Sequence, residues 1–276
     1  MAVAPNPIDL TTLAALKAWL GITVSTSDDM LQQTITNCSR FIVSWLSRAL
    51  LPASYSDRYD GLGSPSSRLM LKQWPVISVS AASIGNTAIA TAPIPGAGVN
   101  YQPGYLLSPG DPFPPGAQQY LDFQGYCLPR GSQNIGVTYR AGYATTESWT
   151  IPATPFQITP TAALGRWGSD EGVTIAGVAA VKVAGPTPAA GQYVVSSVGL
   201  YTFAAADTGK AAVISYGYIP QDVEQAALEM IAFRMKSREF IGLVSKSLGG
   251  QESVTFSQKD MQENVKTMLQ NYRRVF

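Results

Sequence analysis

The stretch Tyr216-Gly217-Tyr218-Ile219-Pro220-Gln221-Asp222-Val223 marks the point where a β-rich region gives way to helix. Proline is favoured in the first turn of a helix, and acidic residues there complement the helix dipole. Apolar residues then recur at helical spacing, so we predict a helix that begins at Pro220. Its apolar stripe consists of Val223, Ala226, Ala227, Met230, Ile231 and Met235.

The C-terminal tail continues with a second predicted helix. Gly249-Gly250 is interpreted as a hinge, and Ser257 is expected to cap a helix that carries Asp260 at its third position. Two such helices present more apolar surface than isolated helices tolerate in water, so a partner is expected. The stripe of the second helix consists of Met261, Val265, Met268, Leu269 and Tyr272.

The last five residues, Tyr272, Arg273, Arg274, Val275 and Phe276, combine aromatic anchors with paired cations. This composition is typical of a docking peptide with a charged rim. Disorder is the alternative for the same residues.

A similar junction occurs earlier, where Tyr139-Arg140-Ala141-Gly142-Tyr143 leads to Ile151-Pro152 without a following helix. Each of the two junctions carries a tyrosine, then Gly-Tyr, then Ile-Pro. We therefore predict that they are the points where the chain leaves for, and returns from, an inserted all-β domain, residues 153–217. Such insertions are tolerated because closing a longer loop costs little, roughly 0.6 kcal/mol per doubling.

Two helices are predicted at the N-terminus. Asp9 is expected to cap the first, which runs to Gly21, and Ser27-Asp28-Asp29 starts the second, which continues to Pro52. The apolar stripe of the second helix predicts that the thiol of Cys38 is buried and inert. Its members are Leu31, Ile35, Cys38, Ile42, Trp45 and Leu46.

We therefore predict an α+β fold in three parts. Residues 1–54 and 218–276 form a helical bundle, residues 55–152 a β-rich hairpin region, and residues 153–217 the inserted domain. Within the middle part, the Pro- and Gly-rich stretch Thr91 to Gly116 is predicted to be a long loop. The predicted strands cover residues 67–71, 75–79, 120–123, 135–139, 156–159, 173–175, 178–183, 192–195, 200–203 and 211–216.

Composition excludes several function classes. The 276 residues include no histidine, which excludes Ser-His-Asp and Cys-His nucleophiles and histidine-ligated metals. Charged residues make up 13 %, about half the usual share, and the net charge is +1. A surface poor in charge favours extensive subunit contact, and the even balance disfavours tight binding of nucleic acid.

The sequence predicts neither export nor a membrane span. Met1 to Asp9 has no basic or apolar signal region, and no run of about eighteen apolar residues occurs, so synthesis in the cytoplasm is expected. Cys38 and Cys127, the two cysteines, are too few for a disulfide framework.

No catalytic, cofactor-binding or metal-binding residue is predicted, and the chain is expected not to be an enzyme. Asp57, Asp60 and Gly61 lack the ladder of a calcium loop and are interpreted as a solvated turn.

One alternative stays open, a carbohydrate-binding or glycosidase site. Asp170-Glu171 and Glu147 lie near Trp167 and Trp149 in the sequence, and carboxylates beside tryptophans are the components of such a cleft. Core or interface tryptophans are the simpler interpretation.

Several stretches in a fixed order resemble the head-to-tail connector, or adaptor, proteins of tailed bacteriophages. The N-terminal ones are Asp9-Leu10-Thr11-Thr12-Leu13, Asp28-Asp29-Met30-Leu31 and Trp45-Leu46-Ser47-Arg48. The middle and C-terminal ones are Trp74-Pro75-Val76-Ile77-Ser78-Val79, Val137 to Tyr143, Ile219 to Ala226 and Tyr272-Arg273-Arg274-Val275. The insertion departs from the family pattern, and Gly191 to Lys210 within it resembles small β-modules of phage structural proteins.

The resemblance implies a dodecameric ring of identical subunits at the head-tail junction of a virion. The C-terminal segment would engage the portal protein, other surfaces would contact tail or neck proteins, and genomic DNA would pass through without specific binding. No membrane partner and no cofactor are implied. The alternative within the same class is another neck or tail-completion protein.

Overall fold

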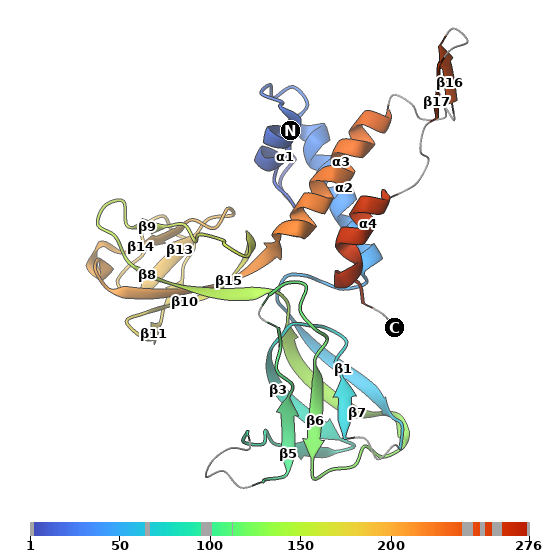
Figure 1. Ribbon diagram of the computed structural model, residues 1–276. Helices are drawn as coiled ribbons and strands as arrows, with labels where there is room; N and C mark the ends of the chain where they lie inside the picture. The colour runs from blue at the N-terminus through green and yellow to red at the C-terminus, as the bar shows by residue number, and fades with distance from the viewer. Residues whose placement is uncertain are drawn as a thin grey trace. The chain divides into compact units, whose positions relative to one another are not determined.

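The computed structural model describes residues 3–63, 67–94, 101–111, 113–238, 245–248, 252–255 and 261–274. The chain divides into two compact units. Unit 1 combines both chain ends, Met1–Arg48 and Pro220–Phe276, and unit 2 is the central segment Ala49–Ile219. Helices dominate the described part of unit 1 and strands dominate unit 2 (Figure 1), so the predicted α+β class is confirmed.

Unit 1 places helices from the two ends of the chain on one apolar core. None of the helices within the described residues is long and apolar enough to cross a membrane. The helices are α1 (Leu13–Leu20), α2 (Asp28–Leu46), α3 (Gln221–Ser237) and α4 (Glu263–Leu269), and the last is followed by the 3-10 turn η3 (Gln270–Tyr272). Buried core residues shared by α1, α2 and α3 are Leu16, Leu31, Ile35, Cys38, Leu228 and Ile231.

The start of α1 differs from the prediction. Thr12, not Asp9, caps the helix, because its hydroxyl accepts the backbone N–H of Ala15 at 3.1 Å. Asp9 is buried and accepts hydrogen bonds from the Asn6 N–H at 2.8 Å and the Gln32 amide at 2.7 Å. Its carboxylate therefore ties the N-terminal turn to α2.

Helix α2 begins as predicted, at Asp28 after Ser27, but ends earlier than predicted. Ser47 adopts a left-handed conformation with φ 56°, and its N–H bonds back to the Val43 and Ser44 carbonyls. This turn, rather than Pro52, stops the helix. The predicted burial of Cys38 is confirmed, and burial raises the pKa of its thiol.

The predicted stripe of α3 is largely confirmed. Val223, Ala226, Ala227, Met230 and Ile231 are buried, and Met235 packs against the edge of the core. Helix α4 starts at Glu263, later than expected, while Ser257 and Asp260 lie outside the described residues. Between α3 and α4, strands β16 (Ser245–Leu248) and β17 (Glu252–Thr255) pair antiparallel.

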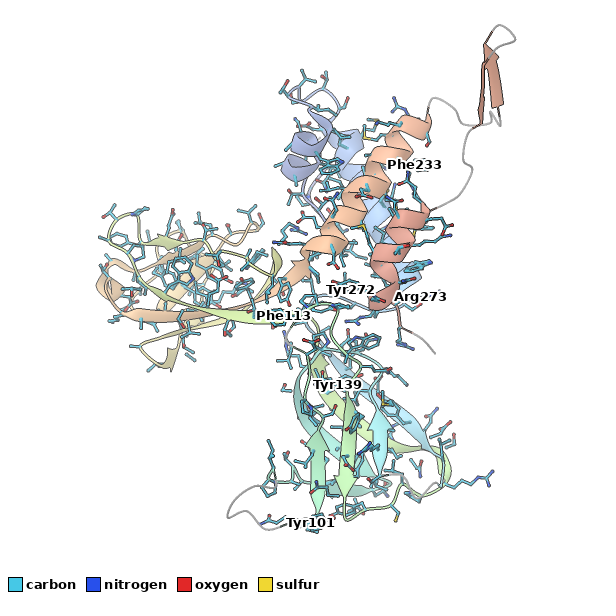
Figure 2. The ribbon with its side chains drawn as sticks, viewed as in Figure 1. Tyr101, Phe113, Tyr139, Phe233, Tyr272 and Arg273 are labelled. Carbon is cyan, nitrogen blue, oxygen red and sulfur yellow. The ribbon has the colours of Figure 1, made fainter. Side chains whose placement is uncertain are left out.

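The first part of unit 2, residues 53–143, is called the first β-lobe. Its sheets have the orders β1-β7-β3-β4 and β2-β6-β5, and the core lies between them, with Tyr139 in its interior (Figure 2). Strand β5 pairs with β6, which corrects the predicted long loop over Thr91 to Gly116. The strands are β1 (Ala53–Gly61), β2 (Arg68–Met70), β3 (Val76–Ile84), β4 (Thr87–Ile89), β5 (Gly104–Leu107), β6 (Tyr120–Gln124) and β7 (Gly131–Ala141).

Strand β1 also corrects the interpretation of Asp57 and Asp60 as turn residues. Both lie within the strand, which pairs with β7. Tyr55, Asp57 and Tyr59 alternate with exposed neighbours, and Asp57 accepts hydrogen bonds from Tyr139 at 2.7 Å and Tyr59 at 3.3 Å. The inward carboxylate is thus satisfied by tyrosine hydroxyls.

The second part of unit 2, residues 144–217, is called the second β-lobe. Its sheets have the orders β11-β10-β15-β8 and β12-β13-β14-β9. The strands are β8 (Ala144–Thr150), β9 (Gln157–Ile158), β10 (Gly165–Ile175), β11 (Val178–Ala179), β12 (Val181–Lys182), β13 (Gln192–Val195), β14 (Tyr201–Phe203) and β15 (Ala211–Pro220).

The second β-lobe leaves and rejoins the chain at one place. Strands β8 and β15 pair antiparallel from Ala144 opposite Gly217 to Thr150 opposite Ala211 (Figure 1). The Tyr218 N–H donates to the Tyr143 carbonyl at 3.0 Å, and the rings of the two tyrosines lie 5.8 Å apart. The two similar sequence junctions are therefore neighbours in space.

Glycines allow this crossing. Gly142 has φ +141°, and a Cβ there would lie 2.5 Å from the Pro52 nitrogen. A Cβ on Gly217 would lie 2.5 Å from Pro52 Cδ, and one on Gly168 would lie 2.4 Å from a Leu51 methyl. Leu51 and Pro52 therefore pack directly on backbone from both sides of the junction.

Candidate functional site

The C-terminal segment, where docking residues were predicted, is partly built into unit 1. Tyr272 is buried, and its hydroxyl lies 2.6 and 2.7 Å from the two carboxylate oxygens of Asp222. Asp222 lies in the first turn of α3, where a carboxylate also complements the helix dipole. The end of the chain is thus fixed to the start of α3.

The two arginines after Tyr272 lie on the C-terminal end of α2. The Arg273 guanidinium stacks over the Trp45 ring at 5.0 Å, and the Arg274 N–H donates to the Leu46 carbonyl at 2.9 Å. Arg273 is otherwise exposed. Val275 and Phe276 lie outside the described residues.

These contacts change the predicted docking element. Tyr272, one of the predicted docking residues, is fully buried and is therefore an internal anchor of unit 1. A role in docking for Arg273, Arg274, Val275 and Phe276 stays a prediction. Gly249 and Gly250, the predicted hinge, lie outside the described residues, between β16 and β17.

The carboxylate of Glu147 on β8 is held by several donors of the second β-lobe. It accepts hydrogen bonds from the Tyr216 hydroxyl, the Thr161 N–H and hydroxyl, the Ala162 N–H and the Trp149 indole. Partial burial alone raises the pKa of this carboxyl, but these hydrogen bonds outweigh burial and lower it. Glu147 therefore acts as a structural anion that fixes the 161–162 turn.

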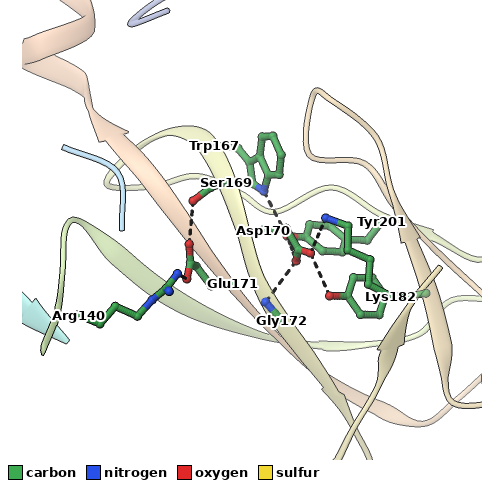
Figure 3. Close-up of polar contacts among 9 residues, drawn as sticks. Arg140, Trp167, Ser169, Asp170, Glu171, Gly172, Lys182 and Tyr201 are labelled. Carbon is green, nitrogen blue, oxygen red and sulfur yellow. Dashed lines mark hydrogen bonds and ion pairs between the residues drawn. The ribbon is translucent and has the colours of Figure 1, made fainter. Parts of the chain in front are cut away.

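Asp170 on β10 has a similar environment. Its carboxylate accepts hydrogen bonds from Tyr193 at 3.0 Å, Tyr201 at 3.2 Å and the Gly172 N–H at 3.3 Å, and it pairs with Lys182 at 3.0 Å (Figure 3). Burial is the main cause that raises the pKa values of both tyrosines. The tyrosines and the lysine come from the facing sheet, so Asp170 joins the two sheets of the second β-lobe.

The neighbouring Glu171 has different partners. It forms an ion pair with Arg140 of β7 and accepts a hydrogen bond from the Ser169 hydroxyl at 2.9 Å (Figure 3). Sequence reasoning noticed Asp170-Glu171 but missed Arg140, Lys182 and the tyrosines. The available signal in the sequence was that Asp170 and Glu171 are adjacent. On a strand, adjacent side chains point to opposite faces, so the two carboxylates must have different partners.

The two tryptophans do not form a cleft with these carboxylates. The Trp167 indole N–H donates to Tyr201 at 3.2 Å, and the ring packs on Gly199, where a Cβ would lie 2.6 Å from Trp167 Cγ. The Trp149 indole donates to Glu147 at 3.1 Å. Both carboxylates are occupied by internal donors, which gives the carbohydrate alternative no support from geometry.

A cavity of about 630 Å³ lies within unit 2 beside Arg140 and Glu171. Its other lining residues include Pro75, Val76, Ile77, Thr146 and Ser215. Within the described residues, no group of three or more carboxylates and cysteines is placed to hold a metal ion.

No protein-family model and no curated protein matches this chain. A chain from the virion of a native gene transfer agent particle is 14 % identical, with a TM-score of 0.40 and coverage of 100 % of this chain and 95 % of that chain. A chain from the neck of an empty gene transfer agent particle is 13 % identical, with the same TM-score and coverage. Identity and TM-score are too low to show a shared fold.

Proposed function

We propose that this protein is a structural head-to-tail adaptor of a tailed-phage-type particle. Copies form a homo-oligomeric ring between the portal and the tail or neck proteins, and the ring extends the channel through which DNA passes. The observation that carries the proposal is that the family-like stretches at both chain ends meet in one unit, whose C-terminal segment is anchored at Tyr272.

In this proposal α1 to α4 act as a helical bundle that forms the body of the ring. The shared core of α1, α2 and α3 supports it, as do the buried Met261, Val265 and Leu269 of the α4 segment. Trp19, Val24 and Met30 stay exposed in the isolated chain, at 50, 61 and 37 %. Exposed apolar side chains on a surface poor in charge favour contact with neighbouring subunits.

The inserted domain, residues 153–217, is proposed to decorate the ring. The pairing of β8 with β15 supports an insertion, because it brings the two ends of the segment together. The exposed Val178 and Val181, at 70 and 60 %, favour a protein contact there, which in a virion would be tail or capsid.

The portal-docking element is proposed to consist of Arg273, Arg274, Val275 and Phe276. Because Tyr272 is held by Asp222, these residues start from a fixed point on unit 1. Gly249 and Gly250 are proposed to let the chain between α3 and α4 adjust when the ring assembles. DNA passage needs no specific grip, which suits a net charge of +1.

Electron microscopy of the purified protein mixed with its cognate portal protein tests the proposal. Coaxially stacked rings are expected. Assembly with the tail-tube protein, and not with portal, would instead support a different neck or tail-completion component. A protein that joins neither assembly contradicts the proposal.

A truncation tests the docking element separately. A chain that ends at Arg274 keeps Tyr272 and its bond to Asp222, so it is expected to fold normally and lose portal binding. Tyr101→Phe with an intact C-terminus is the matched control and should bind portal, because Tyr101 is 62 % exposed. Normal co-assembly of the truncated chain would rule out docking through the last two residues.

A further inference from the structure

Two adjacent carboxylates on β10 connect three different sheets. Successive side chains of a strand point to opposite faces. Asp170 faces the β12-β13-β14-β9 sheet, where Lys182, Tyr193 and Tyr201 bind it. Glu171 instead pairs with Arg140, which belongs to β7 of the first β-lobe. One ion pair thus acts within the second β-lobe, and its neighbour acts between the two lobes of unit 2.

The Arg140–Glu171 pair is well placed to hold the second β-lobe in one orientation relative to the first. The side chain of Glu171 is 11 % exposed, and the Ser169 hydroxyl fixes its second oxygen. Arg140 is 39 % exposed and lies two residues before Gly142, where the chain leaves the first β-lobe. The carboxylate is therefore held ready for the guanidinium on a strand next to the crossing point.

The surroundings leave room for movement on one side of the pair. The cavity of about 630 Å³ is lined by residues of both lobes, among them Val76 and Ile77 of the first β-lobe and Thr146 and Ser215 of the second. On the junction, Leu51 and Pro52 contact Gly168 and Gly217 closely and provide a pivot.

We propose that Arg140 and Glu171 form an orienting pair that holds the second β-lobe in one direction relative to the first, about a pivot at Leu51 and Pro52. Arg140 and Glu171 both line the cavity, away from the close contacts of Leu51 and Pro52 with Gly168 and Gly217. This inference does not depend on the adaptor function.

Distance measurement between spin labels tests the orienting pair. Cys127 is exposed in the first β-lobe, and Val198, 71 % exposed, offers a site in the second as Val198→Cys. Cys38 is buried with a raised pKa, so Cys38→Ala removes a slow side reaction from the background. Glu171→Gln is expected to raise the population of other lobe orientations by about two- to fivefold, which broadens the distance distribution.

Three comparisons complete the test. Lys182→Gln breaks the neighbouring pair within the second β-lobe and should leave the distribution narrow. The charge exchange Arg140→Glu with Glu171→Arg should narrow it again. Salt at about 1 M screens charges that lie more than about 3 Å apart, so it should leave the wild-type distribution nearly as narrow, because these groups are in direct contact and the Glu171 side chain is 11 % exposed. Equal widths for wild type and Glu171→Gln, or equal broadening by Lys182→Gln, would overturn the proposal.

Discussion

The hydroxyl of Tyr272 is the single group that most clearly ties the C-terminus to the rest of unit 1. It lies within hydrogen-bond distance of both oxygens of Asp222, and the side chain is fully buried. Tyr272→Phe removes the donor and leaves the carboxylate short of a partner, so we expect a loss of about 1–2 kcal/mol in the free energy of unfolding. Urea denaturation measures it.

Tyr101→Phe is the control for this change, because Tyr101 is 62 % exposed. It should alter stability by less than about 0.5 kcal/mol. If both variants unfold at the same urea concentration as wild type, the Tyr272–Asp222 contact does not anchor the tail.

Because the pKa of Glu147 is lowered in the folded chain, we expect the free energy of unfolding to depend on pH. Its pKa is lowered in the folded chain from an ordinary value of 4.5, so its contribution is present above that value and lost as the pH falls below it. Glu147→Gln should therefore be less stable than wild type at neutral pH, and the difference should shrink towards pH ~3. Urea unfolding across this pH range checks it, with the exposed Glu263→Gln as control. A difference that stays constant with pH would contradict the assigned charge effect.

Inward carboxylates show which strands could not be predicted from the sequence, and apolar stripes show which helices could. Strands β1 and β8 were missed because their inward positions carry carboxylates, Asp57 and Glu147, instead of apolar residues. Tyrosine hydroxyls from Tyr139 and Tyr216 satisfy them, and nothing local in the sequence identifies those partners. The apolar stripes of α2 and α3 were predicted correctly, because helical periodicity is carried by the segment itself.

At the scale of elements, the close approach of Pro52 to the junction between the two β-lobes depends on Gly142. Its φ is +141°, and a Cβ added at this position would lie 2.5 Å from the Pro52 nitrogen, which leaves no room for a side chain. Gly142→Ala is expected to cost about 2 kcal/mol or more and to weaken the junction. Gly172→Ala, at φ +115° with no atom within 4 Å of an added Cβ, is the control for backbone strain without a clash.

Thermal and urea unfolding of the two glycine variants separate the cost of the clash with Pro52 from the cost of backbone strain. Gly142→Ala should be the less stable by a margin that reflects the clash with Pro52. Equal losses would show that the backbone conformation, and not the close approach, is what requires glycine at the junction.

At the scale of the molecule, the similar sequences of the two junctions suggested that they are neighbours in space, whereas the pairing of β8 with β15 could not be predicted. The predicted insertion began at residue 153, but β8 starts at Ala144 and pairs with β15 down to Gly217. The β8 strand therefore belongs with the segment it introduces. Its inward Glu147 hid this from the alternation of polar and apolar residues.

This arrangement predicts that residues 144–217 can be removed as a piece. The Tyr143 carbonyl and the Tyr218 N–H are 3.0 Å apart, so a short Gly-rich turn can join the flanking residues. The shortened chain is expected to keep its helical circular dichroism and cooperative unfolding, with a loss of about 1–2 kcal/mol from the missing Arg140–Glu171 pair and Leu51 contacts. The segment 144–217 alone should also fold, because it has two sheets and its own buried residues.

A second deletion provides the control for this experiment. Removing residues 104–124 takes Tyr105, Leu121 and Phe123 out of the core of the first β-lobe, so that lobe should unfold. Circular dichroism and urea unfolding of both shortened chains are the measurements. If the chain without 144–217 is as disordered as the control, the second β-lobe is not an insertion in an independent body, because the remainder needs it to fold.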